Sequence, residues 1–489
     1  MSGMGIRGKM MTSFEELGVG REIVRALTLL GMEQPTPVQE AVLPLAFLEK
    51  DILAQAQTGS GKTAAFAIPL CQMVSWEENR PQALVLVPTR ELAMQVQEET
   101  ASVGKFRRMK VPVLMGSHSF RQQERDLRQK AHIVIGTPGR VLDHLEQGTL
   151  ATEAIRYVVL DEADEMLELG FLEQVEEILV QLPKERVTWL FSATLPEKVK
   201  RLASHYLKQP EEIKIAGEPI TTQRIEQTYY DATDWDKVEL LQGILTVLNP
   251  DSCLIFANTR EMVDELCDEL LEYEFSCDRL HGGMEQAERT QVMQDFRRGD
   301  FRYLVATDVA ARGIDIAQIS LVVNYELPDR QENYIHRIGR TGRAGQEGQA
   351  IALVEQSEME NLRQLERLMG VQIPQAVEPT LEEVEAAKPA FLHKMRLSAP
   401  RRLKKSDAFA QEIMKLRIDA GKKGKIRPVD IVGTLCAIAG MTAEDIGVIS
   451  IFDWSSYVEI LNGKGPLVLE ALQTKPLKGQ LRQVTKAEW

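Results

Sequence analysis

Short unbroken runs of apolar residues recur along roughly the first 210 residues, separated by longer stretches in which apolar and polar residues mix. Four of these runs are candidate strands, at residues 83–87, 133–135, 158–160 and 188–191. Strands that are apolar throughout, with helical stretches between them, are typical of a parallel sheet that helices cover on both faces. The pattern predicts an α/β domain over residues 1–210.

The same pattern returns after about residue 222. Its apolar runs lie at residues 252–256, 303–306 and 321–323. We therefore predict an α/β fold with two parallel-sheet domains in tandem, over residues 1–210 and 223–370, joined by a linker at 211–222.

The chain changes character after residue 370. Several prolines, an acidic run and then a basic cluster predict a linker over residues 371–424, with some helix, especially over 406–420. Residues 425–489 regain a globular pattern. We expect helices over 429–439 and 466–472, and strands over 448–451, 457–461 and 480–484. This pattern predicts a small C-terminal α/β domain.

Composition narrows the class of protein. A length of 489 residues exceeds one ordinary core, and 44% hydrophobic with 27% charged residues is typical of soluble globular chains. No window approaches about 18 uninterrupted apolar residues, and the N-terminus lacks the apolar core of a signal peptide, so neither a membrane span nor secretion is expected. The five cysteines show no metal-binding spacing, which favours a reducing cytosol and argues against disulfides or structural zinc.

Charge is distributed unevenly. The formal net charge is −14, yet residues 394–489 contain 17 Lys and Arg against 10 Asp and Glu. An acidic body with a basic C-terminal part predicts a separate module that binds a polyanion, although a solvated charged surface would also explain the imbalance.

A glycine-rich loop at residues 56–63 follows an apolar run and reads AQTGSGKT. It departs from the general phosphate-loop pattern only at Ala56, where a glycine is usual. Gly59 and Gly61 allow the backbone N–H groups to approach phosphates closely. Lys62 adds a positive charge for the β- and γ-phosphates, and Thr63 offers a hydroxyl to Mg²⁺.

Two acidic residues, Asp161 and Glu162, come directly after the apolar run at 158–160. Open α/β sheets bind their ligands at the carboxyl ends of the strands. We expect Asp161 to hold Mg²⁺, directly or through water, and Glu162 to orient and deprotonate the attacking water. Far along the chain, residues 336–343 read HRIGRTGR, and arginines from a second domain could stabilise transition-state charge.

These segments together resemble the DEAD-box ATP-dependent RNA helicases, over residues 14–370. The segment 31–39 reads GMEQPTPVQ and is similar to the family's Q motif. The resemblance implies RecA-like domains and ATP rather than GTP, with Gln39 reading adenine and Phe14 stacking on it. The nucleotide-contacting residues that it implies are Phe14, Gln34, Gln39, Thr58, Gly59, Ser60, Gly61, Lys62, Thr63, Gly313 and Asp315.

The resemblance also implies RNA-contacting and catalytic residues. The RNA contacts fall in the segments PTREL, TPGR, NTR and ATDVAARGID, at Pro88, Thr89, Arg90, Thr137, Pro138, Gly139, Arg140, Asn258, Thr259, Arg260, Thr307, Asp308 and Arg312. The implied catalytic group is Lys62, Asp161, Glu162, Asp164, Thr194, His336, Arg340 and Arg343. Within it, Arg340 and Arg343 are the finger arginines, and Thr194 belongs to the SAT motif that couples hydrolysis to strand separation. Gly116-Ser117 and Gly283 depart from the family pattern.

The last 65 or so residues resemble the RNA-recognition-like domain that ends DbpA-type bacterial DEAD-box helicases. The resemblance implies binding of a large-subunit ribosomal RNA hairpin during ribosome assembly, in the bacterial cytoplasm. Trp454 and Tyr457 could stack on bases. Tyr457 could equally belong to the core. Phosphate contacts could come from Lys464, Lys475, Lys478 and Arg482, although each of them alone is more typical of a solvated surface charge.

The expected function is RNA-dependent ATP hydrolysis that locally unwinds ribosomal RNA. Both parallel-sheet domains would close on one RNA strand and bend it when ATP binds. An ATP-gated RNA clamp that does not unwind productively is the main alternative, and a DNA translocase is a more distant one.

Overall fold

The computed structural model describes residues 12–57, 59–215, 225–311, 319–342, 348–397, 399, 409 and 412–487. The chain divides into two compact units. One contains residues 1–56, 60–215 and 404–489, and the other contains residues 57–59 and 216–403. Among the described helices, none combines the length and the apolar character needed to cross a bilayer.

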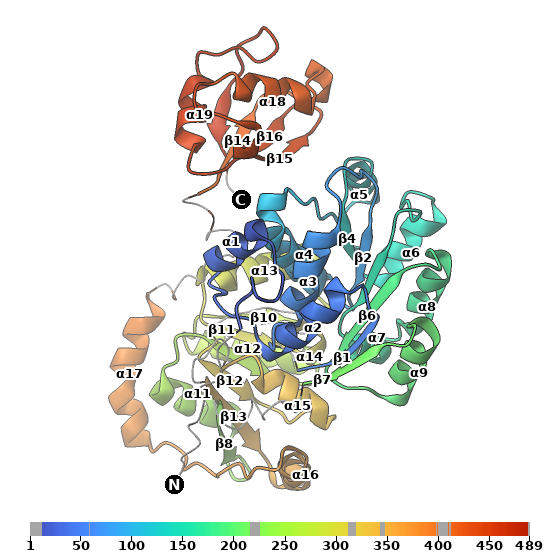
Figure 1. Cartoon of the computed structure of the whole chain (residues 1–489). Coiled ribbons are helices and arrows are strands. Elements are labelled where there is room, and N and C mark those ends of the chain that lie inside the picture. The colour runs from blue at the N-terminus through green and yellow to red at the C-terminus, as the bar shows by residue number, and fades with distance from the viewer. Residues whose placement is uncertain are drawn as a thin grey trace, which may run out of the picture. The chain divides into compact units, whose positions relative to one another are not determined.

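A seven-stranded, fully parallel sheet forms the centre of the first unit. Its strands, in spatial order, are β3 (Val113–Leu114), β4 (Ile133–Gly136), β2 (Ala83–Leu86), β5 (Tyr157–Leu160), β6 (Val187–Ser192), β1 (Ile52–Gln55) and β7 (Glu211–Lys214). Strands β4, β2 and β5 are buried along their whole length, because helices cover both faces of the sheet (Figure 1). The helices are α1 (Arg21–Leu29), α2 (Pro37–Phe47), α3 (Lys62–Met73), α4 (Arg90–Val103), η1 (Lys105–Arg107), α5 (Phe120–Leu127), α6 (Pro138–Glu146), α7 (Ala163–Glu168), α8 (Leu172–Gln181) and α9 (Glu197–Tyr206).

A six-stranded parallel sheet forms the second unit. Its order is β10 (Cys277–Leu280), β11 (Tyr303–Ala306), β9 (Cys253–Phe256), β12 (Leu321–Asn324), β13 (Gly348–Val354) and β8 (Ile225–Asp231). The helices of this unit are α11 (Lys237–Leu248), α12 (Arg260–Glu272), α13 (Gln286–Arg298), α14 (Asp308–Ala311), α15 (Gln331–Ile338), η2 (Gln356–Glu358), α16 (Met359–Met369) and α17 (Leu381–Met395).

The C-terminal module is a four-stranded antiparallel sheet in the order β15 (Ile446–Ile451), β16 (Ser456–Ile460), β14 (Met414–Ile418) and β17 (Val484–Lys486). Helices α18 (Pro428–Cys436) and α19 (Gly465–Ala471) pack on one face of this sheet, as Figure 1 shows, with the short turns η4 (Lys422–Gly424) and η5 (Ala443–Asp445). The module has a hydrophobic core of its own, which includes Leu416, Ile431 and Val458.

The apolar runs of both parallel-sheet domains form strands, so the α/β prediction is confirmed. The linker predicted over 211–222 is wrong at 211–214, where β7 pairs with β1 at the edge of the first sheet. Two further details differ in the linker predicted over 371–424. Residues 381–395 form α17, whose Phe391 ring lies 4.6 Å from Phe275 in the core of the second unit. The helix expected over 406–420 is wrong at 414–418, where β14 lies in the middle of the module's sheet. Leu416 and Ile418 alternate with polar neighbours there, and this period of two suits a half-buried strand.

The module's other elements follow the sequence prediction within a few residues, except that the closing strand begins later, at Val484.

Candidate nucleotide site and nucleic-acid interface

The loop between β1 and α3 has the backbone of a phosphate loop. Gly59 and Gly61 have φ angles of +80° and +93°, a left-handed region that side chains other than glycine rarely adopt. Gly61 caps the N-terminus of α3, so the following backbone N–H groups and the positive end of the helix dipole face the loop. Lys62 and Thr63 are the first two residues of α3, and Lys62 is buried. Thr58 lies outside the described residues.

The candidate adenine-reading residue is tied to this loop. Gln39 is buried in the first turn of α2, and its side-chain Nε2 donates to the carbonyl oxygen of Gly61 over 3.2 Å. Its Oε1 accepts from the backbone N–H of Thr36 over 3.0 Å. A Cβ atom on Gly61 would lie 2.6 Å from Nε2 of Gln39, so this position excludes larger residues. Phe14 is buried in the hydrophobic core of the first sheet, while Gln34 is exposed.

A buried ion pair joins the loop to the acidic strand end. Nζ of Lys62 lies 2.8 Å from Oε2 of Glu162, and both side chains are at most one-tenth exposed. Burial lowers the pKa of Lys62, but the attraction of Glu162 and Asp161 outweighs it, and the pKa lies above its ordinary value. Burial, reinforced by repulsion from Glu162, raises the pKa of the Asp161 carboxyl. Glu162 itself has a left-handed backbone, with φ +52°, which turns the chain directly after β5.

Asp164 connects this strand end to the SAT segment after β6. Its Oδ2 accepts from the backbone N–H and the hydroxyl of Thr194, over 2.7 Å and 2.8 Å. Its own N–H donates to Oγ of Ser192 over 3.1 Å. Burial raises the pKa of Asp164, yet the hydrogen bonds of Thr194 and Ser192 bring it below its ordinary value. Since β5 and β6 are neighbours, the sheet brings Asp161, Glu162 and Thr194 to one edge.

The candidate RNA contacts of the first unit begin two helices at the same edge. Strands β2 and β4 are neighbours and parallel, so the helices that follow them start side by side. Thr89 caps α4 by accepting from the N–H of Leu92 over 3.2 Å, and Thr137 precedes Pro138 and Gly139 at the start of α6. Hydroxyls and helix N-termini of this kind can position phosphates.

Two arginines of these segments meet at Gly116. Arg140 donates to the carbonyl oxygens of Gly116 and His118, over 3.1 Å and 2.9 Å. A Cβ on Gly116 would lie 2.9 Å from Nη2 of Arg90. The segment that departs from the family pattern at Ser117 therefore keeps the glycine that this packing requires. Pro88 lies two residues after the end of β2 and directly precedes Thr89.

The second unit repeats this arrangement at the ends of β9 and β11, which are also parallel neighbours. Asn258 and Thr259 follow β9, and Thr259 caps α12 by accepting from Met262 N–H over 3.1 Å, with Arg260 at the first helical position. Thr307 and Asp308 follow β11 and begin α14. The predicted residues Arg312, Gly313, Asp315 and Arg343 lie outside the described residues. His336 and Arg340 lie in and just after α15, and Arg340 is buried.

Sequence reasoning missed one residue of this edge, Arg337. Its side chain is 1% exposed and pairs with Asp308 through two bonds, of 2.5 Å and 2.7 Å. It also donates to Oδ1 of Asn258 over 2.7 Å and to the carbonyl oxygen of Glu326 over 2.6 Å. Arg337 therefore fixes two of the candidate RNA contacts at once. Its place inside the HRIGRTGR segment was the signal, but its partners follow from the fold.

Replacing Arg337 by lysine is expected to destabilise the protein by about 3–5 kcal/mol, because an ammonium cannot make the forked pair with Asp308 and also donate to Oδ1 of Asn258. Arg367→Lys is the control, since Arg367 pairs with Glu360 on the surface, where such a pair contributes about 0–1 kcal/mol. Urea unfolding of both variants measures the difference. Equal unfolding midpoints would contradict this role for Arg337.

The C-terminal module displays an aromatic and basic cluster. Trp454 is 71% exposed, and Nζ of Lys423 lies 4.3 Å from its ring centre. Phe452 is exposed and packs edge-on against the half-buried Tyr457, over which Lys415 lies. Exposed aromatic rings beside lysines can stack on bases and hold phosphates. Of the lysines that could contact phosphates, Lys464 and Lys478 pair with Asp445 and Asp430, at 2.8 Å and 3.3 Å.

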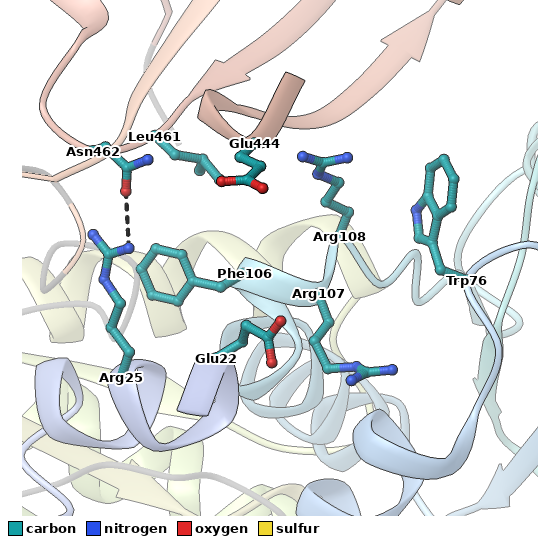
Figure 2. Close-up of a pocket in the computed structure, with 9 residues that line it drawn as sticks. All are labelled: Glu22, Arg25, Trp76, Phe106, Arg107, Arg108, Glu444, Leu461 and Asn462. Carbon is teal, nitrogen blue, oxygen red and sulfur yellow. Dashed lines mark hydrogen bonds between the residues drawn. The ribbon is translucent and has the colours of Figure 1, made fainter. Parts of the chain in front are cut away.

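Within the first unit the module contacts α1 and η1. Lys105 pairs with Glu459 at 2.7 Å with both side chains nearly buried, and Arg25 donates to Asn462 over 2.8 Å. Beside these contacts lies a cavity of about 450 Å³, shown in Figure 2. Its lining combines arginines, carboxylates and aromatic rings: Glu22, Arg25, Trp76, Phe106, Arg107, Arg108, Glu444, Leu461 and Asn462.

Family comparisons cover most of the chain. The DEAD/DEAH box helicase family matches residues 36–202, the helicase conserved C-terminal domain matches 236–345, and the DbpA RNA binding domain matches 415–486. The chain is 50% identical over 477 residues to the ATP-dependent RNA helicase DbpA of Bacillus subtilis, which covers 98% of this chain and 100% of that relative. It is 42% identical to the DEAD-box ATP-dependent RNA helicase CshA of Geobacillus kaustophilus, over 76% of this chain and 80% of the relative.

Solved structures agree with these matches. Dbp5 of S. cerevisiae, bound to RNA and ADP BeF3, superposes with a TM-score of 0.70 at 32% identity, covering 78% of this chain and 99% of that chain. Mss116p, bound to single-stranded RNA and AMP-PNP, gives a TM-score of 0.68 at 29% identity, over 78% of this chain and 83% of that one.

Proposed function

Because the chain belongs to the DEAD-box ATP-dependent RNA helicases of the DbpA type, we propose that it opens short helices of large-subunit ribosomal RNA during ribosome assembly. The observation that carries the proposal is the pairing of two features in one chain. One is the buried Lys62–Glu162 pair beside a phosphate loop, and the other is a C-terminal module with its own core and an exposed aromatic cluster.

Hydrolysis begins with an exchange of partners at the phosphate loop. Lys62 is held by Glu162, and a triphosphate entering the loop would attract Lys62 toward its β- and γ-phosphates. Glu162 would then be released to accept a proton from the attacking water. The left-handed backbone at Glu162 keeps this carboxylate close to the end of β5. The buried ion pair with Lys62 would thus keep Glu162 from acting as a base until ATP binds.

The donor set at this edge suits Mg²⁺, which prefers oxygen ligands. The buried carboxylate of Asp161 and the hydroxyl of Thr63 would hold the ion, directly or through water. When bound, Mg²⁺ would neutralise phosphate charge during transfer. We propose Arg340 and Arg343 of the second unit as the groups that stabilise transition-state charge, and Gln39 as the reader of adenine. Gly313 and Asp315 are proposed to contact the nucleotide.

RNA binding would use the two strand-end edges described above. Caps, arginines and helix N-termini are suited to phosphates and sugars, and such contacts carry no sequence information. Target preference would then come from the C-terminal module, around Trp454 and Lys423. This division separates a core that does not read sequence from a module that selects the RNA.

Thr194→Ala is expected to lower strand separation at least tenfold while ATP hydrolysis stays within a few-fold of wild type. The change removes the hydroxyl bond to Asp164 but leaves the backbone N–H bond in place, so Asp161 and Glu162 are undisturbed. ATPase and duplex unwinding are measured on the same RNA. Thr188→Ala serves as a control for local packing, because Thr188 is buried and lies in β6, the strand that precedes Thr194. Parallel loss of both activities would remove Thr194 from a coupling role.

A single-turnover unwinding assay tests the function as a whole. The substrate is a short RNA duplex flanked by a ribosomal RNA hairpin, and the matched substrate has a scrambled hairpin. We expect ATP-dependent strand separation that the ribosomal hairpin accelerates. ATP hydrolysis without strand separation would favour the RNA clamp instead. Equal rates on both substrates would refute the ribosomal target, and separation of the corresponding DNA duplex would refute the preference for RNA.

A further inference from the structure

Two cysteines of the second unit face each other across the packing of α12 on β10. The Sγ atoms of Cys267, in α12, and Cys277, the first residue of β10, lie 3.3 Å apart. The thiol of Cys277 also lies within 3.4 Å of the carbonyl oxygen of Cys267. A disulfide needs an S–S distance of about 2.05 Å, so a small approach of the two sulfur atoms would join them.

We propose that Cys267 and Cys277 form a reversible disulfide when the protein meets a peroxide. The nucleotide and RNA chemistry assigned above uses neither residue. The disulfide would link the middle of α12 to β10, which is the outermost strand of its sheet.

The position of the pair permits the reaction. Cys277 is 9% exposed at a sheet edge and borders Cys267, which is itself fully buried, as Cys71 and Cys253 are. The Arg279 guanidinium lies on the same strand and pairs with Asp264 of α12 at 3.1 Å. The Cys277 hydrogen bond lowers the pKa of Cys267 against the opposing effect of burial, and the charge of Arg279 adds to the lowering. Burial raises the pKa of Cys71 to about 12, so that thiol stays protonated and unreactive.

The reaction balances with the peroxide as the oxidant. The Cys267 thiolate attacks one peroxide oxygen, an S–O bond forms, the O–O bond breaks, and the leaving hydroxide takes a proton to become water. The Cys277 sulfur then attacks the Cys267 sulfur. An S–S bond forms, the S–O bond breaks, and a second water leaves with the Cys277 proton. Two thiols lose two electrons, and one peroxide is reduced to two waters. A dithiol reductant reverses the link.

The test uses the full chain with Cys436→Ser, because Cys436 is exposed and would crosslink between molecules. Native protein is treated with hydrogen peroxide, quenched, denatured and alkylated with iodoacetamide. It is then reduced and alkylated with N-ethylmaleimide. Trypsin releases both cysteines on one peptide, residues 261–279, and cleavage after Glu272 or Glu274 separates them. We expect Cys267 and Cys277 to carry N-ethylmaleimide in equal amounts, at least tenfold more than Cys71 and Cys253.

Dithiothreitol added after the peroxide and before the first alkylation should reduce the disulfide, so that both residues carry the iodoacetamide label. In the Cys277→Ser variant no disulfide can form, so Cys267 should stop at the sulfenic acid, which dimedone added with the peroxide would trap. Cys267→Ala is the second variant should the serine not fold, and it should leave Cys277 with the iodoacetamide label. The peptide map of the Cys436→Ser chain, in which Cys267 and Cys277 are both intact, alone decides the proposal. Iodoacetamide on both cysteines after peroxide, or their conversion to sulfinic or sulfonic acids without a crosslink, would overturn it.

Discussion

Glu162→Gln is expected to lower RNA-stimulated ATP hydrolysis by about 10²–10⁴-fold, the contribution typical of a general base. ATP and RNA binding should remain within a few-fold of wild type. Glutamine keeps the size of the side chain and can still accept a hydrogen bond from Lys62, but it cannot take a proton from water. Steady-state hydrolysis with saturating RNA, together with binding of a labelled ATP analogue, measures both effects.

Glu168→Gln provides the matched control, because it makes the same change at an exposed position at the end of α7. We expect it to leave hydrolysis unchanged. If Glu162→Gln hydrolyses ATP at the wild-type rate, Glu162 is not the base. A loss of ATP binding in Glu162→Gln would instead show that the buried pair with Lys62 builds the phosphate loop, so that its chief role is structural.

Removing the C-terminal module is expected to abolish the preference for a ribosomal RNA fragment while weak ATPase activity with generic RNA remains. The fold places the boundary of the deletion. Because β14 at 414–418 pairs with both β16 and β17, a cut at residue 425 would leave a central strand of the module behind. The deletion therefore spans residues 404–489. ATPase stimulation across a panel of ribosomal RNA fragments measures the preference, and its survival would place target selection elsewhere.

Trp454→Ala tests the same role of the C-terminal module at a single residue. One stacked base contributes about 1–3 kcal/mol, so the affinity for the preferred fragment should fall by about 5-fold to 150-fold. Trp235→Ala is the matched control, since Trp235 is also exposed but lies in the second unit, outside the module. Equal losses in the two variants would remove the special role of Trp454.

Much of the fold follows directly from local sequence. The runs at 83–87, 158–160 and 303–306 are short and apolar throughout, which is typical of strands buried on both faces, and each forms such a strand. The phosphate loop could also be predicted from the sequence, because its glycines are visible there. Gly61 is needed in the structure, since its backbone is left-handed and Gln39 lies in contact with it. Conversely, the prediction of helix at residues 414–418 was wrong. A short alternating strand beside basic and helix-favouring residues gives a weak local signal.

Sequence alone determined which chemical groups this protein carries and the order in which strands and helices present them, because strand burial, helix caps and glycine-rich turns depend on near neighbours. Only the tertiary structure decided which distant groups become partners. Lys62 and Glu162 are 100 residues apart, Arg337 and Asn258 are 79 apart, and Cys267 faces Cys277 only because α12 folds back onto β10. Such pairs depend on strand order and helix packing, which no local pattern encodes.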